Sequence, residues 1–465
     1  MEVDTIVAVA TPPGRGALAI IRVSGSRTRS LLARVAPGLS DPPVPRRASL
    51  TALRDPKNGR LLDRGLVTFF PGPASFTGED TAEVAVHGGP LLTGMVMEAF
   101  RKAGARAAEA GEFTRRAYLN GKLDLVRAEA VADLIEADSP ALHRAAVHQM
   151  DGGLSRRLSH LREALVEVEA LLMHHLDFPD EDDPPVPAEE VVAQAQALAD
   201  ELDRLLATAP EGELLREGAV AVLAGRPNAG KSSLYNALLG EERAIVTEVP
   251  GTTRDALEAR VSMGGYPFRL VDTAGLREVA DVVESKGIEV AHRYLSDADV
   301  ILLCLPVDQE WTEEERGFRD RFGADRPVIL VRTCADREEG EGAPQTGEEA
   351  QEAGLQPKAH SVVRVSARTG EGLGRLRDTL CQLVFKGLVE ARVDAPILTR
   401  TRQREGVELA RNEVRAFGAA LDSGVPAEAA AAHLKGAEVA LEEILGVIAP
   451  EDVLDRVFAR FCIGK

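Results

Sequence analysis

The sequence predicts a multidomain protein with an N-terminal α+β domain, a discontinuous all-α helical domain, and an α/β domain inserted into the helical one. Short strand-like runs separated by turns fill residues 1–119. Helical spacing of apolar residues appears both before and after the middle of the chain. Between these helical parts, an apolar run ends in a glycine-rich loop. The chain has 465 residues, which is enough for about three domains.

The N-terminal part, residues 1–119, alternates strands and turns. Its strand-like runs are residues 5–10, 17–23, 66–70 and 82–87, with a proline-rich loop at residues 41–45. Two of its turns have unusual sequences: T-P-P-G-R-G-A precedes the strand that holds Arg22, and S-F-T-G-E-D precedes the strand that holds Glu83. From these residues alone, the simpler interpretation of both segments is a turn between strands.

The helical pattern occurs in two separate stretches. Apolar residues recur at helical spacing over residues 123–176, and after an acidic, proline-rich break the pattern resumes and runs to residue 206. Residues 399–465 are helical again. We therefore predict one helical domain, in parts 120–216 and 386–465, that is interrupted by residues 217–385. Such an insertion requires the two ends of the inserted domain to lie close together.

The glycine-rich loop is the most informative segment. It reads G-R-P-N-A-G-K-S-S at residues 225–233, follows the apolar run 219–224 and leads into helical spacing at residues 234–239. In this context G-x-x-x-x-G-K-[ST] is typical of a phosphate-binding loop (P-loop). Backbone N–H groups surround a phosphate, Lys231 reaches the outer phosphates, and the Ser232 hydroxyl binds Mg²⁺. The sequence therefore predicts that the protein binds a nucleoside triphosphate.

Later motifs indicate which nucleotide is bound. A second strand ends in D-T-A-G, where Asp272 reaches the metal through water and the Gly275 N–H meets the γ-phosphate. The polar loop G-T-T-R-D carries Thr253, a second candidate Mg²⁺ ligand. Asp336 follows a later strand, and S-A-R begins at Ser366. This order of motifs resembles the Ras-like GTPases, in which the late aspartate accepts two N–H donors from guanine and the S-A pair supports the guanine oxygen.

The base-reading motif departs from that family. Ras-like GTPases have N-K-x-D, whereas this chain has T-C-A-D at residues 333–336. Asp336 keeps the acceptor for guanine, but Cys334 lacks the lysine stem that normally lies along the base. We therefore expect GTP to be preferred over ATP, with weaker binding of the base. The residues predicted to contact the nucleotide are Asn228, Ala229, Gly230, Lys231, Ser232, Ser233, Thr247, Glu248, Val249, Pro250, Gly251, Thr252, Thr253, Asp272, Thr273, Ala274, Gly275, Asp336, Ser366, Ala367 and Arg368.

Hydrolysis needs a group that orients the attacking water. Many GTPases of this kind have a glutamine directly after D-T-A-G, but this chain has a leucine there, which cannot polarise water. Glu284 or Asp281 in the following acidic segment is the candidate replacement. The positive charge of an arginine finger has no evident source, although Arg254 and Arg277 lie nearby in the sequence. A bound monovalent cation with Asn228 as one oxygen ligand is the alternative.

Charge and cysteine usage narrow the class of protein. The formal net charge is −19, so the chain as a whole repels nucleic acid, and contact with RNA requires a local basic patch. The candidate patches are Arg400, Arg402 and Arg404, or Arg115 and Arg116, and a solvated helix face is the simpler interpretation of each. The four cysteines show no paired spacing, the N-terminus is acidic, and no apolar run approaches 18 residues. We expect a cytoplasmic protein with reduced thiols and no membrane span.

Together these segments resemble one family, the MnmE (TrmE) family of tRNA uridine-modification GTPases, over essentially the whole chain. Its motifs here are D-T-I-V-A-x-A-T-P-P-G-R-G at residues 4–16, S-F-T-G-E-D, H-G-G-P, G-E-F-T-R-R-A-Y-L-N-G-K-L-D-L at residues 111–125, G-R-P-N-A-G-K-S-S, P-G-T-T-R-D, D-T-A-G-L-R and the C-terminal F-C-I-G-K. Several of these motifs go beyond GTPases in general, so the match is specific.

The resemblance implies that the N-terminal domain binds 5-formyl-tetrahydrofolate, or a related one-carbon folate, and forms a homodimer. The residues that match the folate contacts are Arg22, Glu83, Lys122 and Lys465. Cations suit the glutamate tail of folate, and a carboxylate suits the N–H donors of the pterin. Cys462 is either a nucleophile in its thiolate form or a packing residue near the folate.

The resemblance also implies a K⁺-activated GTPase cycle, in which the two GTPase domains of the dimer meet around K⁺. The matching metal ligands are Asn228, Thr247, Val249 and Thr252 for K⁺, and Ser232 and Thr253 for Mg²⁺. Lys231 and Glu284 match the catalytic residues, with Glu284 orienting the water. In a heterotetramer with an FAD- and NADH-dependent, MnmG-like partner, such proteins add an aminomethyl or carboxymethylaminomethyl group to C5 of the wobble uridine of certain tRNAs.

Two other functions remain open from the sequence. One is a folate-dependent one-carbon transferase whose GTPase domain only regulates it. The other is an Era-like ribosome-assembly GTPase, against which the N-terminal domain and the F-C-I-G-K tail argue. The RNA that co-purifies with the protein, tRNA or ribosomal RNA, distinguishes these readings.

Overall fold

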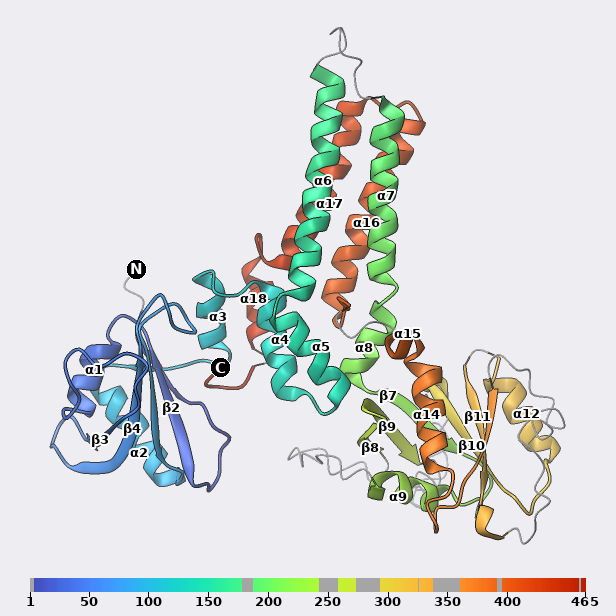
Figure 1. Cartoon of the computed structure of the whole chain (residues 1–465), viewed down its shortest axis with the longest axis horizontal. Helices are drawn as coiled ribbons and strands as arrows, with labels where there is room; N and C mark the ends of the chain where they lie inside the picture. The colour runs from blue at the N-terminus through green and yellow to red at the C-terminus, as the bar shows by residue number, and fades with distance from the viewer. Residues whose placement is uncertain are drawn as a thin grey trace. The chain divides into compact units, whose positions relative to one another are not determined.

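The structure is a computed structural model, and it describes residues 4–177, 187–241, 258–272, 293–324, 326–337, 360–390, 395–459 and 461–465. Contacts divide the chain into two compact units, Met1–Ala132 with Glu438–Lys465, and Asp133–Ala437. Figure 1 shows the chain coloured from the N-terminus to the C-terminus. The boundaries predicted at residues 119, 216 and 385 stay predictions.

The first unit contains a six-stranded sheet in the order β3-β4-β5-β2-β1-β6, antiparallel except for the β1–β6 pair. The strands are β1 (Ile6–Val9), β2 (Leu18–Ser24), β3 (Ser49–Arg54), β4 (Leu61–Phe70), β5 (Thr81–His87) and β6 (Arg106–Ala107). Alternation along β5 buries Val84 and Val86 against helices α1 (Thr28–Val35) and α2 (Pro90–Ala103). This arrangement confirms the predicted α+β class.

Helices complete the first unit beyond its sheet. They are α3 (Glu112–Leu119), α4 (Leu125–Glu136, of which the last four residues belong to the second unit) and α18 (Glu451–Phe458). Leu125, Leu454 and Phe458 form a small apolar core between these helices. The C-terminal tail is held rather than frayed, because Ile463 bridges to Ala110 and the tail pairs with the backbone at the start of α3.

The second unit contains a second six-stranded sheet, in the order β12-β11-β10-β7-β9-β8, parallel except for β8. Its strands are β7 (Ala219–Ala224), β8 (Glu258–Met263), β9 (Tyr266–Asp272), β10 (Val300–Pro306), β11 (Val328–Thr333) and β12 (His360–Arg364), and its helices include α9 (Lys231–Glu241), α12 (Glu313–Phe322), α14 (Leu373–Val384) and α15 (Lys386–Glu390). The inner strands β7 and β10 are apolar and buried throughout, as parallel strands covered on both faces are.

A helical part accompanies this sheet within the second unit. Its helices are α5 (Pro140–Met150), α6 (Gly153–Asp177), α7 (Ala188–Leu206), α8 (Ala209–Glu217), α16 (Thr401–Asp422) and most of α17 (Ala427–Leu445). The long helices α6 and α16 both pack against α7 (Figure 1). Each of these helices has buried apolar residues at helical spacing, for example Leu165 in α6, Leu198 in α7 and Val414 in α16. Both the discontinuous helical part and the α/β part agree with the predicted fold class.

The chain segments that enter and leave the α/β part are joined by direct contacts. The buried Asp133 carboxylate accepts hydrogen bonds from Arg216 Nε at 3.2 Å and from Arg400 Nη2 at 2.5 Å. The Leu398 N–H donates to Thr208 Oγ1 at 3.1 Å. Arg216 and Thr208 precede β7, whereas Leu398 and Arg400 follow α15. The two ends therefore lie together, as an inserted part requires.

No helix in the described part of the chain is both long enough and apolar enough to cross a membrane.

Candidate functional site

The P-loop joins β7 to α9 in the predicted strand–loop–helix order. Gly225 has φ 136°, and a Cβ placed there would lie only 2.4 Å from the carbonyl oxygen of Cys304. This position therefore requires glycine. Asn228 adopts the left-handed conformation with φ 64°, which asparagine tolerates better than most residues. The loop backbone is thereby bent tightly around the start of α9.

Lys231 and Ser232 lie at the N-terminus of α9, where the helix dipole favours an anion. Lys231 Nζ donates to the carbonyl oxygens of Gly225 at 2.9 Å and Arg226 at 2.7 Å, so its side chain folds back over the loop. Ser232 Oγ donates to Asp272 Oδ2 at 2.8 Å. The structure thus brings together two oxygen groups, from α9 and the end of β9, of the kind that Mg²⁺ prefers.

The predicted base-reading residues also meet. Ser366 Oγ donates to Asp336 Oδ1 at 2.7 Å, and Arg368 Nε forms an ion pair with Asp336 Oδ2 at 3.0 Å. The hydrogen bond from Ser366 is the main cause that lowers the pKa of Asp336 below its usual value. The group is therefore a carboxylate at neutral pH and accepts hydrogen bonds only. Cys334 lies next to it with φ 58°.

Sequence reasoning missed the role of Thr333. Its buried hydroxyl donates to the carbonyl oxygen of Ala229 at 2.8 Å, which ties the base-reading loop to the P-loop. The signal was present in the sequence, because Thr333 occupies the first position of T-C-A-D, where the Ras-like pattern has asparagine.

Several predicted residues lie outside the described part of the chain, so their roles stay predictions. They are Thr247, Glu248, Val249, Pro250, Gly251, Thr252, Thr253, Arg254, Thr273, Ala274, Gly275, Arg277, Asp281 and Glu284. The described residues contain no cluster of three or more histidine, cysteine or acidic side chains arranged to bind a metal ion.

Three of the four predicted folate residues gather in the first unit. Arg22 on β2 and Glu83 on β5 are directly opposite each other in the sheet, and Arg22 Nη2 donates to Glu83 Oε1 at 2.8 Å. Arg22 Nη1 donates to the carbonyl oxygen of Gly464 at 3.3 Å, which brings the tail to this pair. Burial, and then the charge of Arg22, lower the pKa of Lys465. Cys462 is exposed.

Aromatic rings flank this group. The Arg22 guanidinium lies 5.8 Å from the ring centroids of both Phe76 and Phe113. Lys122, the fourth predicted residue, donates from Nζ to the carbonyl oxygen of Pro73 at 3.1 Å. Lys122 therefore contacts the segment that leads into the turn carrying Phe76, rather than Arg22 itself. A planar ligand with anionic and N–H groups fits the cations, the carboxylate and the exposed ring of Phe76, whereas the Phe113 ring is fully buried.

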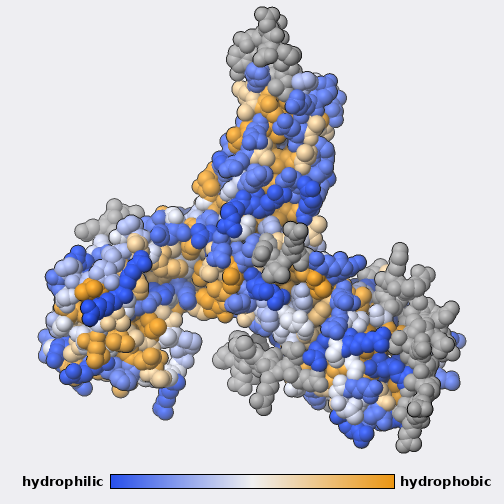
Figure 2. All heavy atoms as spheres, viewed as in Figure 1, coloured by the Kyte–Doolittle hydropathy of each residue, from blue (hydrophilic) through white to orange (hydrophobic). Residues whose placement is uncertain are grey.

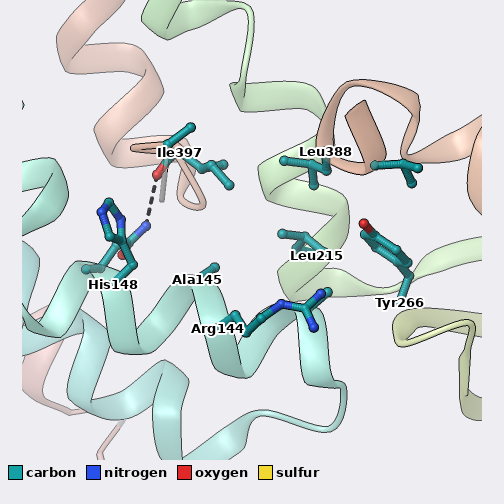
Figure 3. Close-up of a pocket in the computed structure, with 11 residues that line it drawn as sticks. Arg144, Ala145, His148, Leu215, Tyr266, Leu388 and Ile397 are labelled. Carbon is teal, nitrogen blue, oxygen red and sulfur yellow. Dashed lines mark hydrogen bonds between the residues drawn. The ribbon is translucent and has the colours of Figure 1, made fainter. Parts of the chain in front are cut away.

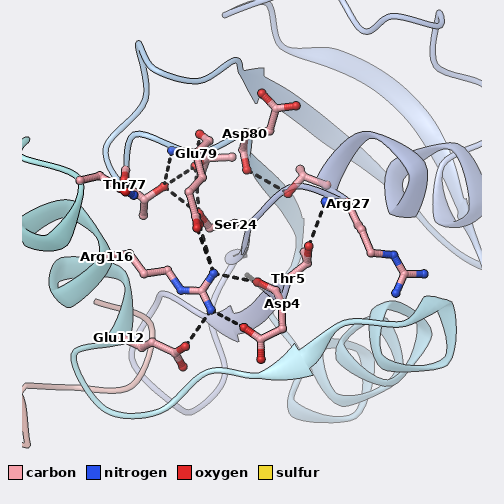
Figure 4. Close-up of polar contacts among 12 residues, drawn as sticks. Asp4, Thr5, Ser24, Arg27, Thr77, Glu79, Asp80, Glu112 and Arg116 are labelled. Carbon is pink, nitrogen blue, oxygen red and sulfur yellow. Dashed lines mark hydrogen bonds and ion pairs between the residues drawn. The ribbon is translucent and has the colours of Figure 1, made fainter. Parts of the chain in front are cut away.

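An ionic network around Arg116 joins three N-terminal motifs (Figure 4). They are the motif that begins at Asp4, the turn S-F-T-G-E-D that holds Glu79, and the motif at residues 111–125. The Arg116 side chain is 8% exposed, and its guanidinium contacts Asp4 at 2.7 Å, Glu112 at 2.9 Å and Glu79 at 3.2 Å. Glu79 Oε2 also accepts a hydrogen bond from Ser24 Oγ at 2.7 Å. Burial would raise the pKa of Glu112, but hydrogen bonds from arginine and backbone donors lower it overall. Arg116 therefore holds the turn S-F-T-G-E-D against α3.

The basic patches considered from the sequence are engaged in ion pairs. Arg115 pairs with Asp455 at 3.0 Å, Arg404 pairs with Glu213 at 3.0 Å, and the Arg400 side chain is largely buried against Asp133. Arg116 and Arg400 are largely buried in their ion pairs, whereas Arg115 and Arg404 keep part of their side chains exposed.

Comparison with known proteins covers the whole chain. A family model described as "GTP-binding protein TrmE N-terminus" matches residues 5–122, and one described as "MnmE helical domain" matches residues 125–462. The protein called tRNA modification GTPase MnmE is 40% identical in Moorella thermoacetica, over 99% of this chain and 99% of that protein. The protein of the same name from Methylorubrum populi is 43% identical over 99% of this chain and 98% of that protein. The one from Neisseria gonorrhoeae is 42% identical over 100% of this chain and 99% of that protein.

Among solved structures, Era of Aquifex aeolicus bound to GDP and AlF4⁻ is 26% identical over 42% of this chain and 66% of that one, with a TM-score of 0.29. A TM-score this low supports no conclusion about the fold. The two family models and the relatives that align from end to end show that the chain belongs to the tRNA modification GTPase MnmE family.

Proposed function

We propose that the protein is a K⁺-activated GTP hydrolase that acts in tRNA modification. With an FAD- and NADH-dependent, MnmG-like partner in a heterotetramer, it adds an aminomethyl or carboxymethylaminomethyl group to C5 of the wobble uridine. The observation that carries the GTPase part is the contact of Ser232 with Asp272 beside Lys231 at the N-terminus of α9. Family membership supports the modification part, and the free thiols fit a cytoplasmic location.

In this proposal each residue acts on a defined part of GTP. Asp336 accepts the two N–H donors of guanine, while Ser366 orients the Asp336 carboxylate. Lys231 exchanges its two backbone carbonyl partners for phosphate oxygens, which are stronger acceptors because they are charged. Ser232 holds Mg²⁺, with Thr253 proposed as its second ligand and Asp272 acting through water. Mg²⁺ neutralises charge on the phosphates.

The remaining charge and the attacking water need two further groups. We assign K⁺ to Asn228 with Thr247, Val249 and Thr252, and at this position K⁺ supplies the positive charge of an arginine finger. Of this ligand set, Asn228 is the residue that the structure describes, and it lies in the P-loop with φ 64°. Glu284 is proposed to orient the water as a general base.

The proposal is tested by GTP hydrolysis in K⁺ and in Na⁺ at equal ionic strength, each compared with ATP. We expect hydrolysis to depend strongly on K⁺ and to prefer GTP. Equal rates in both salts would contradict the cation assignment and make Arg254 or Arg277 the leading candidate. Equal turnover of ATP and GTP would show that T-C-A-D does not read guanine.

We further propose a homodimer formed by the N-terminal unit. One sheet face packs on α1 and α2, whereas the other face carries a row of neighbours in register: Leu50, Leu66, Ala85 and Ile20. Leu50 is 70% exposed and Leu66 44% exposed, and Figure 2 shows hydrophobic residues gathered on this unit. An exposed apolar sheet face favours association with a second copy.

We propose 5-formyl-tetrahydrofolate as the ligand of Arg22, Glu83, Lys122 and Lys465. Replacing Arg22 with methionine is expected to weaken folate binding at least about tenfold, because a charge-assisted hydrogen bond to the ligand is lost. Basal GTP hydrolysis is expected to stay at the wild-type rate. The matched control is Arg101→Met, which removes an exposed arginine from α2. Calorimetric titration that shows the same folate affinity in Arg22→Met and Arg101→Met would remove Arg22 from the site.

A further inference from the structure

A link between the P-loop and helix α12 involves a residue outside the predicted nucleotide contacts. Arg226 is the second residue of the P-loop. Its Nε donates to Glu315 Oε1 at 2.6 Å, and its Nη2 donates to the Glu310 carbonyl oxygen at 3.3 Å. Glu315 lies in the first turn of α12, and Glu310 lies in the segment between β10 and α12. The Arg226 side chain thus fastens the P-loop to this helix and to the segment before it.

Glu315 is a buried group that uses both of its carboxylate oxygens. Its side chain is 5% exposed. Oε2 accepts hydrogen bonds from the Thr312 N–H at 2.9 Å and from Thr312 Oγ1 at 3.0 Å, which forms the capping box of α12. Oε1 accepts from Arg226. A carboxylate buried to this degree is costly without a cation, so Arg226 is needed at this place. The cap of α12 and the P-loop therefore share one carboxylate.

The backbone of Arg226 continues the link to Lys231. The Arg226 carbonyl oxygen accepts a hydrogen bond from Lys231 Nζ at 2.7 Å and one from the Ala229 N–H at 3.3 Å. The Ala229 carbonyl oxygen in turn accepts from Thr333 Oγ1 at 2.8 Å. The turn over which Lys231 folds is therefore held at one end by Glu315 and at the other by Thr333, and both of these side chains come from outside the P-loop.

Other contacts in this unit lie away from the P-loop. Beside a cavity of about 340 Å³, Gln149 Nε2 donates to the Ile397 carbonyl oxygen at 2.9 Å (Figure 3). The cavity is lined by α5, α8, β9, α15 and the segment that follows α15, so this contact joins the helical part to the end of the α/β part. The Arg226–Glu315 pair, by contrast, has one member in the P-loop itself. A change in Glu315 therefore reaches the phosphate-binding residues directly.

We propose that Glu315 is a positioning residue for the P-loop. Through Arg226 it fixes the turn of the loop before a nucleotide arrives, so binding does not have to order the backbone that surrounds the phosphates. This role rests on the proposed GTPase function of the same loop. It acts on the affinity for both GDP and GTP, because the phosphates of both lie in the loop. It acts less on kcat, because a bound nucleotide itself holds the loop in place.

Glu315→Gln separates the two uses of Glu315. A glutamine at this position keeps the capping box, because its Oε1 still accepts from Thr312. Its amide nitrogen then faces Arg226, and two donors form no hydrogen bond with each other. In calorimetric titration of the full chain with GDP and Mg²⁺, we expect the Kd to rise about tenfold. In steady-state hydrolysis we expect the KM for GTP to rise by a similar factor, while kcat changes by less than about twofold.

Two further variants control this experiment. Glu314→Gln makes the same substitution at an exposed neighbour in the same turn, and the Kd for GDP is expected to stay at the wild-type value. The double variant, Arg226→Met with Glu315→Gln, tests the route of the effect. Because Glu315 acts through Arg226, the double variant is expected to bind GDP no more weakly than Arg226→Met alone. Thermal unfolding of the nucleotide-free chains measures any loss of stability separately.

Three outcomes would overturn the proposal. The first is the same affinity for GDP in Glu315→Gln and Glu314→Gln, even if Glu315→Gln unfolds at a lower temperature. The second is additive losses in the double variant, which would mean that the two residues act independently. The third is a fall in kcat without a rise in KM in Glu315→Gln, which would place the effect in the transition state rather than in binding.

The proposed function fails in a different way. Equal hydrolysis of GTP in K⁺ and Na⁺ by the wild-type chain would contradict the cation assignment, but the GDP titrations would still test Glu315. A wild-type chain that binds no GDP would overturn both the proposed function and the positioning role.

Discussion

Asp336→Asn is expected to lower the affinity for GTP by about 10²-fold or more and to make xanthosine triphosphate the better ligand. In the proposed complex the Asp336 carboxylate accepts both N–H donors of guanine, and the hydrogen bond from Ser366 Oγ orients that carboxylate. An asparagine amide directs its own N–H group at one of these donors. Two donors that face each other cannot form a hydrogen bond, so the variant site rejects guanine. Xanthine carries an oxygen at that position and accepts the amide N–H instead.

Fluorescent nucleotide titration measures this change directly. The matched control is Asp308→Asn, which makes the same chemical substitution in an ion pair with Arg337 at 3.5 Å. We expect the control to keep its preference for GTP. Similar losses in both variants would mean that local charge, rather than the hydrogen bonds of Asp336, determines the affinity. An unchanged affinity in Asp336→Asn would show that guanine is read elsewhere.

Arg116→Met is expected to destabilise the N-terminal unit by about 3 kcal/mol, because it leaves the largely buried Glu79 carboxylate without its cation, whereas Asp4 and Glu112 keep their ion pairs with Arg106. The three partners of Arg116 are Asp4, Glu79 and Glu112, and the Glu112 side chain is only 10% exposed. Arg115→Met is the matched control. Arg115 pairs with Asp455 and Glu451, whose side chains are mostly exposed, so its loss is expected to cost less than about 1 kcal/mol.

Amide hydrogen exchange in β1 and α3 measures the free energy of opening for each variant. The pH dependence provides a second readout with a definite sign. Glu112 has a folded-state pKa below its unfolded value of 4.5, so its contribution is present at neutral pH and is lost as the pH falls below about 4.5. Arg116→Met is expected to lose only part of this acid sensitivity, because the hydrogen bonds from Arg106 and from the Glu109 N–H still lower the pKa of Glu112. Equal protection in the Arg115 and Arg116 variants would contradict a structural role for the network.

Local sequence determined the P-loop almost completely. The G-x-x-x-x-G-K-S spacing, the apolar β7 before it and the helical pattern after it all lie within about one strand–loop–helix unit, whose geometry neighbouring residues dictate. Four strands of the N-terminal sheet were also predictable. The strands β3 and β6 were not, because β3 mixes polar and apolar residues without a run of β-branched or aromatic side chains, and β6 has only two residues.

The sequence by itself thus determined the fold class, the phosphate-binding loop and the family motifs. Only the tertiary structure decided which side chains of distant segments meet: Arg116 with Asp4 and Glu79, and Gln149 with Ile397. The physical reason is that a periodic pattern or a tight turn depends on neighbouring residues, whereas an ion pair depends on two side chains that folding alone brings together. Arg116 therefore resembled a surface charge in the sequence and proved to be a buried one.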